Sequence, residues 1–217
     1  MATTSNATPL TRHPCRDGPL LVVVEGANDV RFLKRLSALL READSTILDL
    51  QSLEQRGSLV FIPFGGGNVL PWSDRLAPLR CPEAHIYDRE VPPETALREA
   101  AIDRINVRPG CWAQLTRLPT AEHYLLPTLA AIRGTAESSI PTVEIPAYVA
   151  TSWYLQRGVL PVWHELATRQ RQRFIQRAKS WLFSHVLPRM TLDHLHAVDP
   201  HGEIAGWFTT MANLIGG

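Results

Sequence analysis

Acidic residues stand close behind three of the strands that this sequence predicts, and they are the residues best suited to chemistry. In chain order they are Glu25 with Asp29, Asp88 with Glu90, and Glu122. Carboxylates that converge repel one another strongly unless cations lie among them. Oxygen ligands of this kind select Mg²⁺ or Mn²⁺. The pattern therefore predicts a divalent-metal site, whose natural chemistry is phosphoryl transfer with metal ions that polarise the phosphate and activate water.

The segments that would position these acids alternate between strands and helices. Short apolar runs predict two buried strands, at residues 21–24 and 58–64, and two further strands are predicted at 83–87 and 111–116. Helices are predicted between and after them, the first beginning near Asp29 and later ones over 69–79, over 93–106 and from Ala121. This alternation is typical of an α/β protein, a parallel sheet covered by helices.

In such a sheet the carboxyl ends of the strands meet at one edge, which is where open α/β folds bind their ligands. We therefore expect the acids that follow the strands to gather at this edge. Side chains two residues apart in an extended segment share a face. This spacing predicts that Asp88 and Glu90 point together and that Arg89 points away.

A change of composition after about Gly134 divides the chain. We expect a flexible polar tail over 1–18, an α/β domain over 19–134 and a helical C-terminal extension over 135–217. Within the extension the sequence predicts a connector over 135–146, one long helix over 161–187 and shorter helices over 191–197 and 203–215. The long helix is basic, and its cations either contact DNA phosphates or only face solvent: Arg169, Arg171, Arg173, Arg177 and Lys179.

The bulk composition excludes several classes of protein. The 217 residues carry a net charge of +1, so a site for nucleic acid must be local. Three widely spaced cysteines form neither a disulfide framework nor a zinc pattern and fit a reducing cytosol. No apolar run approaches the length of a membrane span, and the polar N-terminus does not resemble a secretory signal. The sequence thus predicts a cytoplasmic protein with no membrane partner.

The acidic motifs resemble those of the TOPRIM domain, which topoisomerases, bacterial primases and several nucleases share. That domain has a glutamate after its first strand and Asp-x-Asp after its third, and here Glu25-Gly26-x-x-Asp29 and Asp88-x-Glu90 stand in those places. The details are most similar to the TOPRIM nucleases of the overcoming-lysogenization-defect (OLD) family. Their later block Glu-x-Glu-Asn-Tyr corresponds here to residues 120–124, of which Glu122 and Tyr124 match. Glu90 departs from the usual Asp.

The resemblance implies a TOPRIM fold of Rossmann-like type and a role for each matching residue. Glu25, Asp29, Asp88 and Glu90 would hold one or two Mg²⁺ or Mn²⁺ ions, and Glu122 would complete the second site. Glu25 would alternatively act as general acid or base. OLD nucleases also carry a lysine in a C-terminal helical part, and Lys179 is the position we assign to it, where it would neutralise charge on the phosphate.

The implied function is a metal-dependent DNA endonuclease or nickase, in a setting such as phage defence or a mobile element. No Gly-x-x-x-x-Gly-Lys-Ser/Thr motif is present, so ATP hydrolysis is not expected, and a separately encoded ATPase is an implied partner. Two alternatives to a nuclease stay open. One is a non-catalytic nucleic-acid-binding subunit of a larger complex, and the other is a primase-like or RNA-processing TOPRIM enzyme. A homo-oligomer is also compatible with the sequence.

Overall fold

The computed structural model of this chain describes residues 18–141, 144–156 and 163–216. Within them a parallel sheet has the strand order β2-β1-β3-β4. The strands are β1 (Leu20–Val24), β2 (Leu59–Pro63), β3 (Glu83–Tyr87) and β4 (Cys111–Leu115). The predicted α/β fold is confirmed, and each strand lies within one or two residues of its predicted bounds. The predicted tail falls almost wholly outside the described residues.

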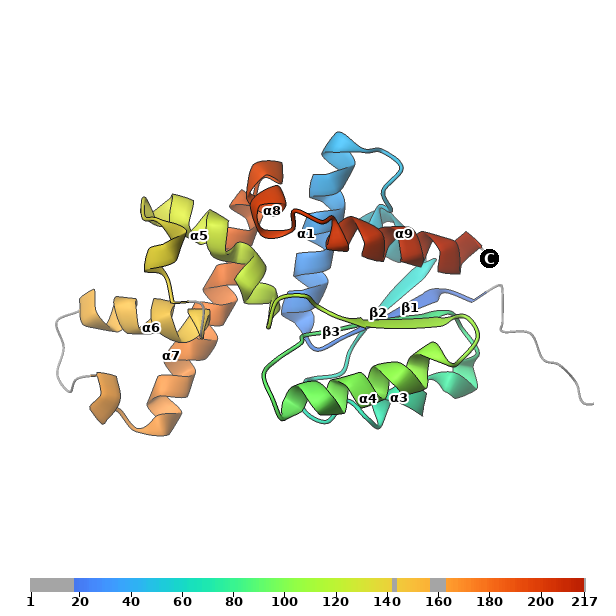
Figure 1. Ribbon diagram of the computed structural model, residues 1–217, viewed down its shortest axis with the longest axis horizontal. Coiled ribbons are helices and arrows are strands. Elements are labelled where there is room, and N and C mark those ends of the chain that lie inside the picture. Colours follow the sequence, from blue (N-terminus) through green and yellow to red (C-terminus); the bar gives the residue numbers. More distant parts are fainter. Residues whose placement is uncertain (1–17, 142–143, 157–162, 217) are drawn as a thin grey trace, which may run out of the picture.

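Alternation along the central strand β1 divides the core between the two faces of the sheet. Leu20, Val22 and Val24 point into a core shared with α1 (Ala27–Ala43) and α9 (Glu203–Gly216). Leu21 and Val23 point the other way, into a core shared with α3 (Trp72–Arg75) and α4 (Glu94–Asn106). Figure 1 shows α1 and α9 on one side of the sheet and α3 and α4 on the other. The strand is buried on both faces, which is why its sequence is continuously apolar.

The remaining helices form a lobe beside the sheet, as Figure 1 shows for α5 to α8. They are α5 (Leu126–Arg133), α6 (Ile145–Gln156), α7 (Thr168–Trp181) and α8 (Leu192–Val198). Two shorter helical pieces precede strands of the sheet, α2 (Leu50–Gln55) before β2 and η1 (Ala77–Leu79) before β3. The others follow β4 and are η2 (Ala121–Leu125), η3 (Glu137–Ser139), η4 (Trp163–Glu165), η5 (Leu182–Val186) and η6 (Leu187–Arg189). The C-terminal part is therefore helical, as predicted.

Two details of this lobe differ from the sequence prediction. The long helix expected over 161–187 is wrong at its start, because Ala167 is extended and α7 begins only at Thr168. Residues 161–162 lie outside the described part. The segment expected to be a connector and its continuation contain α6, which the sequence reading missed. Its β-branched and aromatic residues are apolar on most sides, so no polar stripe marks it as a helix.

Aromatic contacts join α6 to α7. The rings of Tyr154 and Phe174 lie 5.5 Å apart, and those of Trp153 and Trp181 lie 5.3 Å apart in an edge-to-face arrangement. Such ring pairs add about 0.5–1.5 kcal/mol each beyond their buried area. They fix α7, the basic helix, against the rest of the lobe. Throughout the described segments, every helix is too short or too polar to cross a membrane.

Candidate metal centre

Glu25 directly follows β1, and its side chain lies on the side of the sheet that α4 covers. There its carboxylate accepts hydrogen bonds from Arg98 Nε at 3.2 Å and Nη2 at 2.8 Å. Arg98 comes from α4 and is 5% exposed, and its Nη2 also lies 3.7 Å from Glu90 Oε1. One buried guanidinium therefore bridges two acids of the predicted site. The sequence reading missed Arg98, because a single arginine in an amphipathic helix is ordinarily solvated.

Asp29 lies in the first turn of α1, on the other side of Glu25. The backbone N–H of Gly26 donates a hydrogen bond of 2.7 Å to its Oδ2, which holds the carboxylate at the sheet edge. Burial raises the pKa of Asp29 to about 6, although the Gly26 N–H and the charge of Lys179 oppose the shift. The Gly26 hydrogen bond is half of the capping box of α1, so Asp29 caps this helix while it lies buried beside the other acids.

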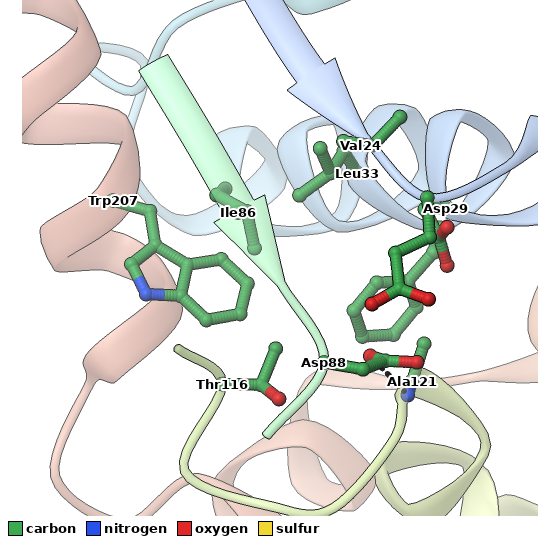
Figure 2. A pocket seen from close by; sticks show the side chains of 10 residues that line it. Val24, Asp29, Leu33, Ile86, Asp88, Thr116, Ala121 and Trp207 are labelled. Carbon is green, nitrogen blue, oxygen red and sulfur yellow. Dashed lines mark hydrogen bonds between the residues drawn. The ribbon is translucent and has the colours of Figure 1, made fainter. Parts of the chain in front are cut away.

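Asp88 follows β3 and faces Asp29 from below the strand ends. Figure 2 shows the two carboxylates pointing toward each other, with apolar side chains such as Ile86 and Trp207 lining the pocket beside them. Asp88 is 8% exposed and accepts a hydrogen bond of 3.1 Å from the backbone N–H of Ala121. Burial, and then the charge of Asp29, raise the pKa of Asp88 well above its usual value. In the absence of a cation its negative charge is costly.

Glu90 reaches the site by a route that differs from the predicted one. The strand ends at Tyr87, and Glu90 adopts a left-handed backbone conformation with φ of 54°, so extended alternation does not place it. A hydrogen bond of 2.8 Å from its N–H to Pro119 O holds this turn, which costs a non-glycine residue about 1–2 kcal/mol. Oxygens of Glu25, Asp88 and Glu90 all lie within 4.8 Å of one another. Three of the five predicted acids therefore converge tightly.

Glu122 and Lys179 approach the same edge from the helical part. Glu122 lies in η2 and is 2% exposed, and its Oε1 forms an ion pair of 2.9 Å with Lys179 Nζ of α7. Burial lowers the pKa of Lys179, but Glu122 and then Asp88 outweigh this effect and raise it, so the amine stays charged. The structure therefore brings Lys179 beside the acids. Glu122 is engaged with Lys179 and stands outside the tight group of three.

An open cleft of about 340 Å³ gives access to these side chains, with Glu25, Asp29, Asp88 and Lys179 on its walls. Gly65 and Gly66 form part of its rim and have φ of 88° and 76°, a conformation that side chains rarely adopt. A Cβ at either glycine would meet no atom within 4 Å, so the rim is bare. The cleft is thus reached by solvent at the acids, where a phosphate could approach.

The chemistry of this donor set fits a hard divalent cation. Five carboxylates gather here, and among the described residues Arg98 and Lys179 are the cations that pair with them. The excess of negative charge, the oxygen ligands and the access from solvent all suit Mg²⁺ or Mn²⁺. Glu25, Asp88 and Glu90 would hold the first such ion. Asp29 lies next to them and would help to hold a second ion.

The raised pKa of Asp29 predicts a pH dependence of stability for the protein in EDTA. Because the folded-state pKa exceeds the unfolded value, the stabilisation from protonated Asp29 is complete below about pH 4 and is lost as the pH rises through about 6. Asp29→Asn should therefore gain stability relative to wild type across this window, by on the order of 2 kcal/mol in urea unfolding. Charges facing Asp29 from other elements, namely Glu25, Glu122 and Lys179, broaden the transition.

Asp44 provides a matched control, for which the expected change of stability with pH has the opposite sign. Thr46 lowers the pKa of the exposed Asp44, so Asp44→Asn should lose stability relative to wild type as the pH rises. If the difference between wild type and Asp29→Asn is independent of pH from about pH 4 to 7, the assignment of a protonated, buried Asp29 is wrong.

Comparisons with known proteins assign little beyond the geometry. No family model matches the sequence, and no curated protein matches it. Among solved structures, the chain is similar to the C-terminal region of the Xanthomonas campestris pv. campestris OLD protein. The two share 13% sequence identity with a TM-score of 0.44, over 91% of this chain and 98% of the other. A likeness of this size is too weak to assign a family or an activity.

Proposed function

We propose that this chain is a divalent-metal-dependent nuclease that hydrolyses phosphodiesters of DNA through a TOPRIM-type carboxylate site. The observation that carries the proposal is the convergence of Glu25, Asp88 and Glu90, whose oxygens lie within 4.8 Å of one another, with Glu25 and Asp88 on the wall of an open cleft. Glu25 follows β1 and is far along the sequence from Asp88 and Glu90, which both follow β3. Acids held together in this way, with Asp88 buried among them, destabilise a fold, so a functional reason for their convergence is the simplest one.

The chain's own residues supply binding, orientation and charge at this site. Arg98 fixes Glu25 and Glu90 in place, and the Gly26 N–H fixes Asp29, so the ligands are preorganised. A bound Mg²⁺ or Mn²⁺ would supply Lewis acidity and activated water. Lys179 is the cation on the wall of the cleft, placed to stabilise the negative charge that develops on a phosphate. Glu25 as a general acid or base is the alternative role.

The basic face of α7 favours a polymeric phosphate over a small one. Arg169, Arg173 and Arg177 recur at four-residue intervals and are exposed, so they form one row along the helix. The helix contains no acidic residue, and within the described segments these arginines form no ion pair. The row lies beside the face that carries Lys179. A nucleic-acid backbone that follows the row would deliver a phosphate to the cleft.

Cleavage of supercoiled plasmid by the purified full chain tests the proposal. We expect nicking in Mg²⁺ or Mn²⁺ and none in EDTA, whereas Ca²⁺, with its longer oxygen distances and flexible coordination, should support binding of DNA but not nicking. Titration of Mn²⁺ followed by calorimetry shows independently whether the ion binds. Metal binding without nicking would favour a non-catalytic binding subunit. Cleavage of RNA alone would favour the RNA-processing alternative. A separately encoded ATPase partner remains a proposal from the sequence resemblance.

A further inference from the structure

A second cleft, of about 460 Å³, opens beside the metal centre between η2, α6 and α7. The two clefts share Gln176 and Lys179 on their walls, and the acids Glu90 and Glu122 also line the second one. Its volume lies within the ~300–1,000 Å³ typical of small-ligand sites. None of the roles proposed above uses this space.

The walls of this cleft combine apolar and polar side chains. Apolar surface comes from Pro119 in the segment before η2, from Pro146 of α6 and from Ile175 of α7. His123 adds an imidazole ring, whose Nδ1 lies 2.9 Å from Thr120 Oγ1 and is thereby oriented. An imidazole ring is a surface on which a nucleobase stacks, and the apolar side chains beside it would shield the stacked base from water.

The polar groups of the cleft are suited to a neutral, hydrogen-bonding ligand. Gln172 and Gln176 lie one turn apart on α7 and line the cleft, and no hydrogen bond joins either side-chain amide to another described residue. Glu144 and Glu122 bring negative charge to the walls, which opposes a phosphate there. Amide donors and acceptors together with carboxylate acceptors match the edge of a base.

We infer that this cleft is a nucleobase subsite that takes one unpaired base next to the phosphate held at the metal centre. The inference rests on the proposed function and adds the substrate class to it. In a duplex each base is stacked and paired, so it would have to leave the helix to enter the cleft, at a cost of a few kcal/mol. The preferred substrate is therefore single-stranded DNA, or DNA with an unpaired nucleotide at the cleavage point. The arginine row of α7 carries the flanking backbone.

Filling the cleft tests the inference with binding and cleavage measured separately. Ala147 of α6 lines the cleft, and Ala147→Trp would occupy the space of the base. Leu155→Trp is the matched control, because Leu155 is 63% exposed near the end of the same helix. The probes are fluorescein-labelled oligodeoxynucleotides, used as a single strand and as the blunt duplex of the same sequence. Fluorescence anisotropy in Ca²⁺ reports binding, gel analysis in Mn²⁺ reports cleavage, and calorimetry reports Mn²⁺ affinity.

We expect wild type to bind the single strand at least about tenfold more tightly than the duplex, the size of one base-stacking contact. Ala147→Trp should lose this preference while Mn²⁺ affinity is unchanged, and Leu155→Trp should behave as wild type. Equal affinity of wild type for the two probes, or a full preference retained by Ala147→Trp, would overturn the inference. Binding is measured without catalysis, so a wild type that prefers the single strand but never cleaves would refute the nuclease and leave the subsite standing.

A second pair of variants serves where Ala147→Trp does not fold. Gln172→Leu removes an amide from the cleft, and Gln170→Leu makes the same change at an exposed position of α7 outside it. Of these two variants only Gln172→Leu should lose the single-strand preference, because Gln172 lines the cleft and Gln170 does not. Equal behaviour of the two glutamine variants would contradict the assignment of the cleft.

Discussion

Replacement of Asp88 by Asn is expected to abolish metal-dependent nicking while leaving the metal-free protein at least as stable as wild type. The carboxylate is one of three that converge within 4.8 Å, so its loss removes a direct ligand. Residues that merely support metal ligands already cost about 10–100-fold when changed, so a loss of at least about 100-fold in nicking is expected here. Plasmid nicking in Mn²⁺ and calorimetric titration of Mn²⁺ measure both effects.

The stability side of this prediction follows from the burial of Asp88. Burial and the neighbouring carboxylates raise its pKa well above the usual value, so the ionised form destabilises the fold at neutral pH. Asn has nearly the same shape, carries no charge and can still accept the hydrogen bond from the Ala121 N–H. We therefore expect Tm in EDTA to stay equal or to rise, whereas most substitutions of buried residues lower it.

Asp103→Asn provides the matched control, because Asp103 is an exposed acid on α4 away from the cleft. It should change neither nicking nor Tm. Wild-type nicking by Asp88→Asn would refute the site, and a fall of several degrees in its Tm would refute the account of its charge. A metal site that holds destabilising acids together in this way trades stability for function.

The sequence was sufficient to predict the edge of the sheet but not every residue that completes the site. Alternation of apolar runs and helices predicts parallel strands, and parallel strands bring Glu25 and Asp88 to one edge whatever the detailed packing. Local spacing did not predict the position of Glu90, because a left-handed residue after β3 breaks the extended alternation. Proximity of Glu122 to Lys179 came from the family resemblance alone, since 57 residues separate them.

Arg98 shows why the other residues of the site could not be predicted from the sequence. Its exposure depends on where α4 docks, and nothing in the local sequence distinguishes it from Arg104, the exposed arginine of the same helix. The same holds for α6, whose apolar residues lack a single face and so give no helical period. The sequence predicted β3 only as a strand. The structure shows that one face of β3 has buried polar side chains, Glu83 and His85 among them, and the second large prediction rests on these.

Replacement of Arg108 by Met is expected to destabilise the fold by about 3–5 kcal/mol, the usual cost of removing one partner of a buried ion pair. Glu83 of β3 is 1% exposed, and Arg108 donates to its two oxygens at 2.9 and 2.6 Å. His85, two residues along the same face, donates or accepts at 2.8 Å on Glu83 and at 2.7 Å on Tyr87. Burial raises the pKa of Glu83, but His85 and Arg108 outweigh it, so the carboxylate stays charged and needs Arg108.

Urea unfolding at neutral pH measures the loss, and two further variants establish its cause. Arg104→Met removes an exposed arginine from α4 and should change stability by no more than about 0.5 kcal/mol. The double variant Arg108→Met with Glu83→Gln carries no unpaired buried charge, so it should recover a large part of the loss. A double variant no more stable than Arg108→Met alone would mean that Arg108 acts through packing of its stem. Because Glu83 lies at the opposite end of β3 from Asp88, Mn²⁺ affinity should stay unchanged throughout.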